Sequence, residues 1–302
     1  MRPPFPTVLD ASAMSAFRAC PRKFELEYLH HWKPKDQSIH LHAGGAFAHG
    51  IEAARRAFFE QGRNSTEALA IGVEELLRFY GGSFPVPEDS PKSATRMAGA
   101  LEYYLSEAFP FDLETATPVL LPSGGRGIEF SFLEPLDVPH PDTGEPLLYS
   151  GRFDTLVEYA GNVFGEDDKT TSQLGATWPD QWNLRGQFTG YCWGAARAGR
   201  PIQGMLVRGV SILKRGYDHA QTVTYRHPWM IDRWYEQTLR DINRMIKMWE
   251  EGKFDYNLDE SCSAYGGCMF KQVCLSENPD PWLEVGFQRR QWNPVTREET
   301  VL

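Results

Sequence analysis

The sequence predicts an α/β fold in which a mixed β-sheet is flanked by helices. Apolar residues recur at helical spacing in three stretches, residues 65–80, 93–109 and 230–251. Runs rich in β-branched and aromatic residues, which are typical of strands, lie between them at residues 147–159, 162–170 and 202–213. Because helices and strands alternate along 302 residues, we expect one large domain or two lobes with a sizeable core.

The composition limits the class of protein. Hydrophobic residues make up 41% of the chain and aromatic residues 13%, which indicates a folded globular protein. The formal net charge of −9 argues against a protein that coats DNA by bulk electrostatics. No apolar run approaches the roughly 18 residues that a membrane-spanning helix needs, and the first residues do not resemble a signal peptide. We therefore expect a soluble, cytoplasmic protein that has no membrane partner.

Two of the predicted strands form a hairpin with its turn at Ala160-Gly161. Side chains alternate along a strand, so Asp167 and Lys169 project from one face of the second strand, and Glu166 and Asp168 from the other. If the pairing brings Asp154 of the first strand alongside Asp167, two carboxylates and one ammonium meet at one place. Uncompensated acids at close range favour a divalent cation.

Two carboxylates and a lysine around a cation suit phosphodiester hydrolysis. Oxygen ligands fit Mg²⁺ or Mn²⁺, which polarises a phosphate and lowers the pKa of bound water, while lysine neutralises developing charge. Gln187 and Tyr191 lie four residues apart in a predicted helix over 182–198 and therefore share one face. For Asp167 and Lys169 taken alone, a solvated strand edge is the simpler interpretation.

Three motifs occur in a fixed order, and together they carry a resemblance. They are Gly151-Arg152-Phe153-Asp154, then Asp167-Asp168-Lys169-Thr170, then Gln187-Phe188-Thr189-Gly190-Tyr191. This order resembles the core of the PD-(D/E)XK nuclease superfamily in its RecB/AddB-like branch, and it is similar to the small exonuclease of CRISPR adaptation systems. One position departs from the pattern, because Asp168 stands where the family has a bulky or aromatic residue.

The resemblance implies a restriction-endonuclease-like core and a set of site residues. Gly45 followed by His49 matches the first motif of the branch, whose histidine is a metal ligand. The implied metal ligands for Mg²⁺ or Mn²⁺ are His49, Asp154, Asp167 and the carbonyl of Asp168. The implied catalytic residues are Asp154, Asp167, Lys169, Gln187 and Tyr191. Lys169 would position the attacking water, and Gln187 and Tyr191 would orient the strand or brace the site.

Four of the five cysteines form a second candidate site. Cys262, Cys268 and Cys274 are spaced C-x5-C-x5-C, and Cys20 lies near the other end of the chain. Disulfides are not expected in a reducing cytoplasm, so four thiolates indicate structural zinc or an iron–sulfur cluster. The resemblance favours a [4Fe–4S] cluster that clamps the N- and C-terminal regions. Cys192 lies in a predicted helix and is expected in the core.

A basic segment follows the candidate active site. Residues 181–227 hold seven basic side chains and one acid, Asp218; the basic ones are Arg185, Arg197, Arg200, Arg208, Lys214, Arg215 and Arg226. The segment suits the path of a phosphate backbone. An ordinary charged surface explains it equally well.

We divide the sequence into five regions. Residues 1–50 hold the first cluster cysteine and the candidate metal-binding histidine, 51–110 a helical lobe, and 111–255 the nuclease core. Residues 256–279 form the cysteine loop and 280–302 a polar tail.

The combined prediction is a metal-dependent DNA nuclease with a structural cluster. The resemblance implies an exonuclease that acts on single-stranded or single-strand-ended DNA. Two alternatives remain open. One is a non-catalytic nucleic-acid-binding or assembly subunit that keeps the nuclease fold, and the other is a domain that holds structural zinc in place of the cluster. The sequence does not reveal protein partners.

Overall fold

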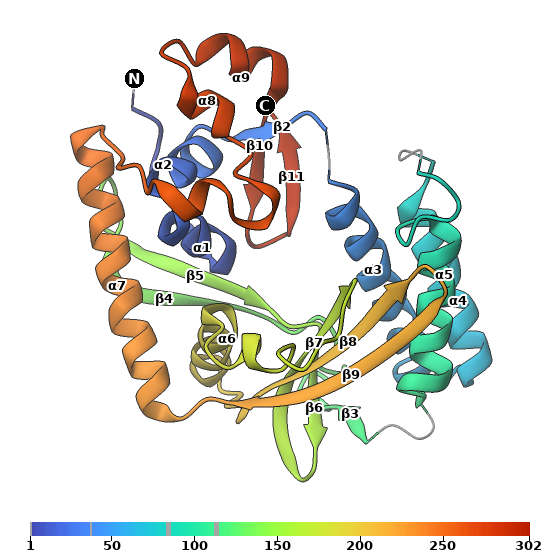
Figure 1. The fold of residues 1–302 in the computed structure, drawn as a ribbon. Coiled ribbons are helices and arrows are strands. Elements are labelled where there is room, and N and C mark those ends of the chain that lie inside the picture. Colours follow the sequence, from blue (N-terminus) through green and yellow to red (C-terminus); the bar gives the residue numbers. More distant parts are fainter. Residues whose placement is uncertain (1, 37, 83–85, 112–114) are drawn as a thin grey trace. The chain divides into compact units, whose positions relative to one another are not determined.

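The computed structural model describes residues 2–36, 38–82, 86–111 and 115–302, apart from the side chain of Tyr265. The chain forms two compact units (Figure 1). The terminal unit comprises Met1–Asp36, Phe132–Gly151 and Pro228–Leu302, and the central unit comprises Gln37–Ser131 and Arg152–His227. Among the described helices, none is both long and apolar enough to cross a lipid bilayer.

The central unit contains a five-stranded sheet with strand order β3-β6-β7-β8-β9. β7 and β8 run parallel, and the other neighbours are antiparallel, so the sheet is mixed as predicted. The strands are β3 (Ala116–Pro118), β6 (Thr155–Tyr159), β7 (Asn162–Thr171), β8 (Gly204–Leu213) and β9 (Gly216–Tyr225).

The predicted hairpin is confirmed. β6 and β7 pair from Thr155 opposite Glu166 to Tyr159 opposite Asn162. The two turn residues, Ala160 and Gly161, have φ values of 48° and 76°. Positive φ at both central positions gives a turn whose twist matches that of the flanking strands.

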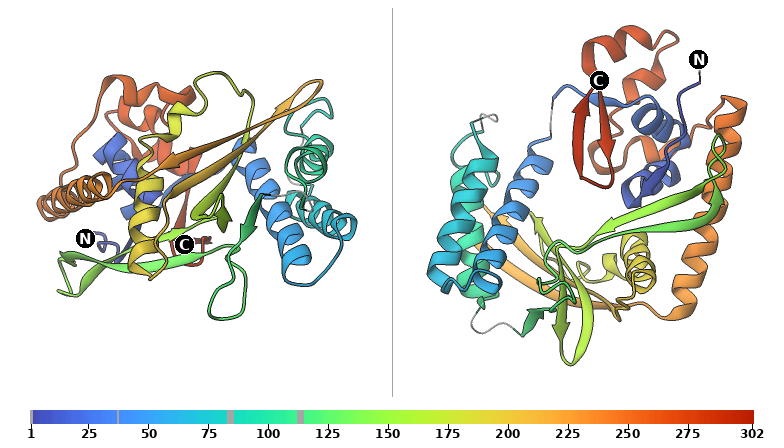
Figure 2. Two further views of the ribbon diagram at one scale, coloured as in Figure 1. Left: turned by 90° about the horizontal axis from the view of Figure 1, so that it is seen from below. Right: turned by 180° about the vertical axis from the view of Figure 1, so that it is seen from behind.

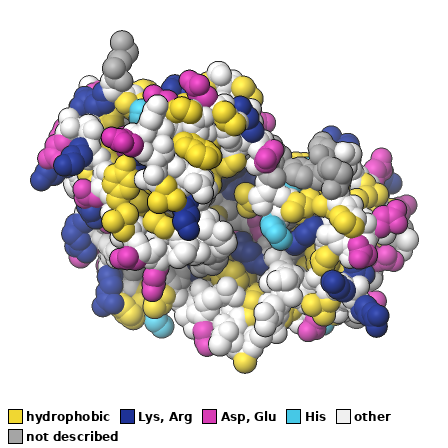
Figure 3. Space-filling view, turned by 45° about the horizontal axis from the view of Figure 1, so that its top comes forward, with side chains coloured by type: hydrophobic (Ala, Val, Ile, Leu, Met, Phe, Trp, Pro, Cys, Tyr) yellow, Lys and Arg dark blue, Asp and Glu magenta, His cyan; other side chains and the backbone are white. Residues whose placement is uncertain are grey.

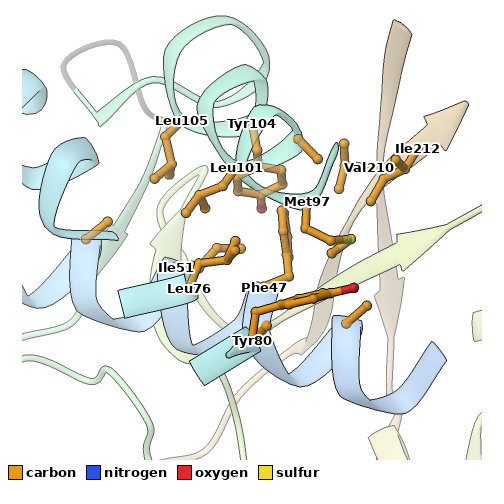
Figure 4. Close-up of a cluster of buried hydrophobic side chains, with 14 of the residues drawn as sticks. Phe47, Ile51, Leu76, Tyr80, Met97, Leu101, Tyr104, Leu105, Val210 and Ile212 are labelled. Atoms are coloured by element: carbon orange, nitrogen blue, oxygen red, sulfur yellow. The ribbon is translucent and has the colours of Figure 1, made fainter. Parts of the chain in front are cut away.

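Three helices form the helical lobe of the central unit, and the views agree that they gather on one side of the sheet (Figures 1 and 2). They are α3 (Ile39–Phe59), α4 (Ser65–Tyr80) and α5 (Ala94–Tyr103), the last continued by a π-helical turn, Tyr104–Ala108. Their buried side chains pack with Val210 and Ile212 of β8, so one core joins the lobe to the sheet (Figure 4). Helix α3 runs through the boundary expected at residue 50.

Helices α3 and α4 approach each other closely at Gly50 and Gly72. A Cβ atom at Gly50 would lie 3.0 Å from the carbonyl oxygen of Gly72, and one at Gly72 would lie 2.7 Å from that of Gly50. Real Cβ atoms essentially never come within 2.7 Å of a backbone oxygen, so Gly72 requires glycine, and a Cβ at Gly50 would need the neighbouring backbone to shift. This contact fixes how α4 lies on α3.

The helix after β7 is shorter than the sequence predicted. α6 covers Gly186–Arg197, whereas the apolar periodicity indicated residues 182–198. The first part is instead a 3-10 turn, Asp180–Trp182, and Arg185 is extended with ψ of 112°. α6 therefore begins immediately before Gln187, which places that side chain in the first helical turn.

The terminal unit contains two three-stranded sheets, ordered β1-β5-β4 and β11-β10-β2. Its strands are β1 (Val8–Asp10), β2 (Trp32–Pro34), β4 (Ser131–Pro139), β5 (Pro146–Arg152), β10 (Phe287–Asn293) and β11 (Glu298–Val301). Its helices are α1 (Ala11–Ala19), α2 (Pro21–Phe24), α7 (Pro228–Glu251), α8 (Lys271–Leu275) and α9 (Asp280–Gly286).

The polar tail, residues 280–302, folds as α9 and the β10–β11 hairpin. β10 pairs with β2 from the start of the chain, so the two ends share a sheet. Asp10 caps α1 by accepting the backbone N–H of Ala13, and its other oxygen accepts the indole N–H of Trp292 at 2.9 Å. Backbone pairing and this indole contact hold the tail in place.

The single strand predicted over 147–159 is wrong. The structure divides it into β5 and β6, which belong to different sheets. Between them the N–H of Phe153 donates to the carbonyl of Phe130, outside either ladder. Residues 147–149 before Phe153 and residues 155–157 after it both fit a strand, so the pattern does not reveal the break. The break leaves Asp154 outside both strands, beside β7.

Candidate active site

The candidate site lies in the central unit, where β6 ends beside β7. Thr155 is paired with Glu166, so the next position outward sets Asp154 opposite Asp167. The backbone N–H of Asp168 donates to Oδ2 of Asp154 at 2.7 Å. The Asp154 side chain thus takes the position of the backbone acceptor that a longer β6 would have supplied.

Burial places Asp154 and Asp167 where negative charge is unfavourable. Burial raises the pKa of Asp154 well above its usual value, and the charges of Asp167 and Asp168 add to this effect while Lys169 opposes it. Burial also raises the pKa of Asp167, although Lys169 partly offsets it. Among the described residues, Oδ2 of Asp167 accepts no hydrogen bond apart from its ion pair with Lys169. The protein alone leaves this pair of acids undercompensated.

Lys169 projects from the same face of β7 as Asp167, as the strand alternation predicts. Its ammonium forms an ion pair with Oδ2 of Asp167, and its side chain is 33% exposed. Burial alone would lower the pKa of Lys169, but the charges of Asp167 and Asp154 outweigh it and raise the pKa. Lys169 therefore remains protonated at neutral pH, as a fixed cation open to solvent.

Gln187 and Tyr191 of α6 contact each other. The side-chain amide of Gln187 donates to the Tyr191 hydroxyl at 2.8 Å. The Tyr191 ring packs edge-on against Phe153, with ring centroids 4.8 Å apart, and its hydroxyl is near enough to Lys169 to raise the lysine pKa. Tyr191 thus lies between the lysine and the residue that precedes Asp154.

The opposite face of β7 carries a buried ion-pair network. Arg55 of α3 donates to Oδ2 of Asp168 at 2.6 Å and to Glu166, and Nη1 of Arg208 lies 3.2 Å from the other Glu166 oxygen. The Tyr104 hydroxyl donates to Oδ1 of Asp168. Burial, followed by the Asp168 charge, raises the pKa of Tyr104 well above its usual value, so the phenol remains neutral and donates.

Glu129 is a neighbour of the site that sequence reasoning did not single out. Its N–H donates to the carbonyl of Asp154 at 2.9 Å, and its carboxylate lies 2.7 Å from Nε of Arg152. Its φ of 54° is unusual for a residue other than glycine. Burial raises the pKa of Glu129 to about 7, and the charge of Glu52 adds to this while Arg152 opposes it. In the sequence, Glu129 is marked only as an acidic residue between the apolar residues Ile128 and Phe130.

His49 lies on the exposed surface of α3, and its ring stacks on Phe79 of α4 with centroids 4.2 Å apart. His42, two turns earlier, stacks on the same Phe79 ring. The resemblance predicts His49 as a metal ligand beside Asp154 and Asp167. In the part of the chain that the structure describes, no three His, Cys, Asp or Glu side chains are placed to hold a metal ion. The ligand role of His49 stays a prediction.

The residues at the site fit a divalent cation in part. Asp167 is buried and the adjacent Asp154 half-buried. The pKa values of both are raised, so a cation would neutralise charge that the protein leaves uncompensated. The carbonyl of Asp168 belongs to the same strand. The Asp168 side chain does not fit, because Arg55 and Tyr104 hold it on the other face.

The four candidate cluster cysteines all belong to the terminal unit. Burial raises the pKa of Cys274, and Cys268, Cys20 and Cys262 each add to this effect, so the four thiols share one region. The loop is compact, since the N–H of Cys268 donates to the carbonyl of Cys262. The described conformation does not bring three of them into a metal-binding arrangement. Cys192 is separate and buried in α6, as predicted.

The predicted basic surface is smaller than the sequence suggested. Two of its seven basic residues, Arg208 and Arg226, are buried. The guanidinium of Arg226 donates to Thr189 and to the carbonyls of Trp182 and Tyr225, and so holds the start of α6 on β9. Figure 3 shows Lys and Arg side chains interspersed with Asp and Glu on the face that it draws. Arg185, just before α6, is exposed and lowers the pKa of Asp167.

Comparisons with solved structures give distant similarities. A structure described as a candidate exonuclease from Eubacterium rectale has 8% sequence identity and a TM-score of 0.49; the match covers 86% of this chain and 88% of that one. The structure of a protein designated SSO0001 has 14% identity and a TM-score of 0.31, with 76% of this chain and 83% of that one covered. No curated protein sequence matches the chain.

Comparison with models of protein families gives a match over most of the chain. The matching model describes the PD-(D/E)XK nuclease superfamily, and it aligns with residues 9–275. The aligned region contains Asp154, Asp167, Lys169 and the α6 motif. On this match, and on the geometry of the β6–β7 hairpin that agrees with it, the chain belongs to the PD-(D/E)XK nuclease superfamily.

Proposed function

We propose that this protein hydrolyses phosphodiester bonds in DNA and depends on Mg²⁺ or Mn²⁺. The observation that carries the proposal is the adjacent, undercompensated pair of half-buried Asp154 and buried Asp167, with the Lys169 ammonium against it. Membership of a nuclease superfamily supports the reaction class. A DNA substrate with a single-stranded end, cleaved as by an exonuclease, follows from the resemblance to the RecB/AddB-like branch.

Asp154, Asp167 and the carbonyl of Asp168 would hold the cation, with His49 as a predicted further ligand. When bound, the ion supplies a Lewis acid for the phosphate and lowers the pKa of a coordinated water. Lys169 is protonated at neutral pH, so it acts as a hydrogen-bond donor and a positive charge, and not as a general base. Its ammonium orients the attacking water or stabilises charge on the phosphate oxygens.

Gln187 and Tyr191 would act as positioning residues. Their mutual hydrogen bond fixes the Tyr191 hydroxyl, and the contact of Tyr191 with Phe153 braces the segment that leads into Asp154. Gln187 is partly exposed in the first turn of α6, where its remaining polar groups are available to a nucleic acid strand.

The test is Lys169→Ala, assayed with Mg²⁺ and with Mn²⁺ on single-stranded DNA, duplex DNA and single-stranded RNA. Each substrate carries a label at either end. We expect the variant to remain folded and to lose cleavage by roughly 10²-fold or more. Its melting temperature without metal should fall, because Asp167 loses its counter-ion. Lys253→Ala, an exposed lysine of the terminal unit just after α7, is the control and should retain full activity.

The outcomes separate the candidate functions. Full activity in purified Lys169→Ala would contradict the proposed mechanism. A wild-type protein that binds the labelled strands but cleaves none of them would instead establish the non-catalytic subunit. Mononucleotide products released from one labelled end would identify an exonuclease and its polarity.

We further propose that Cys20, Cys262, Cys268 and Cys274 hold a [4Fe–4S] cluster that ties the start of the chain to its end. Beyond burial, the other three thiols each raise the pKa of Cys274, which supports this assignment because the effect requires the four thiols to lie close together. Thiolates are also the usual ligands of such clusters. Such a cluster would be structural, because it closes a loop between residues distant in sequence. Structural zinc is the alternative for four thiolates.

Anaerobic purification tests the cluster. A brown protein with broad visible absorbance and about four iron atoms per chain is expected for [4Fe–4S]. A colourless protein with one equivalent of zinc would replace the cluster by a zinc site. A colourless protein without stoichiometric metal would contradict both assignments.

A further inference from the structure

Asp168 lies between the two candidate catalytic residues of β7, but its side chain faces away from them. The carboxylate is 3% exposed and receives three interactions. Arg55 donates from Nη1 at 2.6 Å and approaches from Nη2 at 3.5 Å, and the Tyr104 hydroxyl donates to Oδ1. A planar guanidinium and a phenol therefore fix both oxygens of this side chain.

The partners of Asp168 are themselves held in place. Arg55 also donates to Thr155 of β6 at 2.9 Å and to Glu166 of β7, so one guanidinium spans both strands of the hairpin. The Tyr104 ring packs edge-on against Phe47 with centroids 5.7 Å apart, inside the core of the helical lobe. The position of Asp168 is thus set by α3 and by the turn after α5.

The backbone of Asp168 points the other way, toward the site. Its N–H donates to Oδ2 of Asp154 at 2.7 Å. Asp154 precedes β6, so no ladder hydrogen bond from β6 fixes this part of β7. On its other edge β7 is still paired with β8, where Asp168 lies opposite Arg208, so β8 holds the backbone from that side. The side-chain contacts of Asp168 add a second restraint, from the face opposite the site.

We propose that Arg55 and Tyr104 are positioning residues, which hold Asp168 so that its N–H orients the Asp154 carboxylate toward the metal ion. The inference rests on the proposed function, because it concerns the same cation. It also accounts for the departure from the family pattern, since Asp168 anchors β7 by ion pairing where a bulky residue would do so by packing. The interaction acts across the strand, from a side chain on one face to a carboxylate on the other.

Glu166 offers a matched control within the same network. It is on the same face of β7, shares Arg55 with Asp168 and also pairs with Arg208. Glu166 is paired with Thr155 in the regular β6–β7 ladder, whereas the backbone N–H that contacts Asp154 belongs to Asp168. Glu166→Gln weakens the same ion-pair network without changing the residue that contacts Asp154.

The experiment compares wild type, Asp168→Asn and Glu166→Gln. Three quantities are measured: the melting temperature, the dissociation constant for Mn²⁺ without DNA, and kcat and KM for cleavage. Asp168→Asn keeps the backbone N–H and carbonyl. We expect both variants to be less stable, but only Asp168→Asn to weaken Mn²⁺ binding, by about tenfold, which is typical for loss of a group that orients a metal ligand. Its kcat should fall while its KM for DNA stays unchanged.

Tyr104→Phe is the second variant, in case Asp168→Asn does not fold. It keeps the ring and removes only the hydroxyl that donates to Asp168. We expect weaker Mn²⁺ binding in the same direction, by a smaller factor. Equal effects of Asp168→Asn and Glu166→Gln on Mn²⁺ binding, or no effect of Asp168→Asn and Tyr104→Phe, would overturn the inference. A wild-type protein that neither binds Mn²⁺ nor cleaves would count against the proposed function itself.

Discussion

The backbone N–H of Asp168 donates a 2.7 Å hydrogen bond to the carboxylate of Asp154, where β6 has already ended. This bond keeps a buried acid beside Asp167, although burial and the neighbouring charges raise the pKa values of both. Two adjacent carboxylates at this position repel each other, and the proposed cation would neutralise them. Stability and function are therefore opposed at Asp154.

Asp154→Asn should stabilise the metal-free protein. The amide oxygen can still accept the N–H of Asp168, while the buried charge is lost. We expect the melting temperature in excess EDTA to rise by roughly 2–6 °C, about 1–2 kcal/mol, with loss of cleavage when metal is supplied.

The pH dependence of stability provides a check on Asp154→Asn. A carboxyl group whose folded pKa is raised binds protons more readily when folded, so a fall in pH stabilises the folded state. The stabilisation by Asn should therefore shrink as the pH of the metal-free protein is lowered. A melting temperature that falls in Asp154→Asn at neutral pH would show that the carboxylate is well compensated.

His49→Ala, compared with His42→Ala, tests the predicted histidine ligand. Both rings stack on Phe79, so either substitution removes a similar packing contact. If His49 binds the metal, His49→Ala should raise the Mn²⁺ dissociation constant by about tenfold or more, and His42→Ala should leave it within twofold. Isothermal titration without DNA measures both. Equal, small effects would identify His49 as a packing residue only.

Arg185→Ala should weaken DNA binding. Arg185 is exposed next to α6, and its charge acts on Asp167, so a phosphate held at the site would lie within its field. In a Lys169→Ala background we expect affinity for single-stranded DNA to fall several-fold. The slope of log K against log salt concentration should become less steep by about 0.7. Arg197→Ala, at the other end of α6, is the control. Identical salt slopes in the two variants would place the DNA elsewhere.

Single cysteine substitutions should divide the five cysteines into two classes. Cys274→Ser is expected to lose most of the bound metal and to lower the melting temperature, because one of four ligands is removed. Cys192→Ala should keep the metal. Burial raises the pKa of Cys192 to about 12, so iodoacetamide should modify it only after denaturation. Metal analysis and mass spectrometry of alkylated peptides provide the measurements.

Much of the local structure was predictable because it depends on neighbours in the chain. The helix at Ser65–Tyr80 was predicted with its observed bounds from apolar residues that recur every turn. The structure adds a capping box of Asn64 and Glu67 at its start. The hairpin turn at Ala160-Gly161 was predicted from two turn residues between strand-like runs. Alternation along β7 correctly separated Asp167 and Lys169 from Glu166 and Asp168.

Other features depended on contacts that the local pattern does not encode. At the break between β5 and β6 the N–H of Phe153 donates to Phe130, a residue distant in sequence, and the segments on both sides fit a strand pattern. Arg208 and Arg226 looked like part of a basic surface, but Glu166 and the carbonyls near α6 hold them in the core. Burial of an arginine depends on distant partners, and the charge count contains no information about them.

The sequence by itself determined the superfamily, the order of the acid, acid and lysine motifs, and the face of β7 on which each side chain lies, because strand alternation is a property of the local backbone. Only the tertiary structure decided what each side chain meets: Arg55 and Tyr104 for Asp168, Phe79 for His49, and Arg152 for Glu129. Those partners come from segments far apart in the chain, and packing free energy, not local periodicity, selects them.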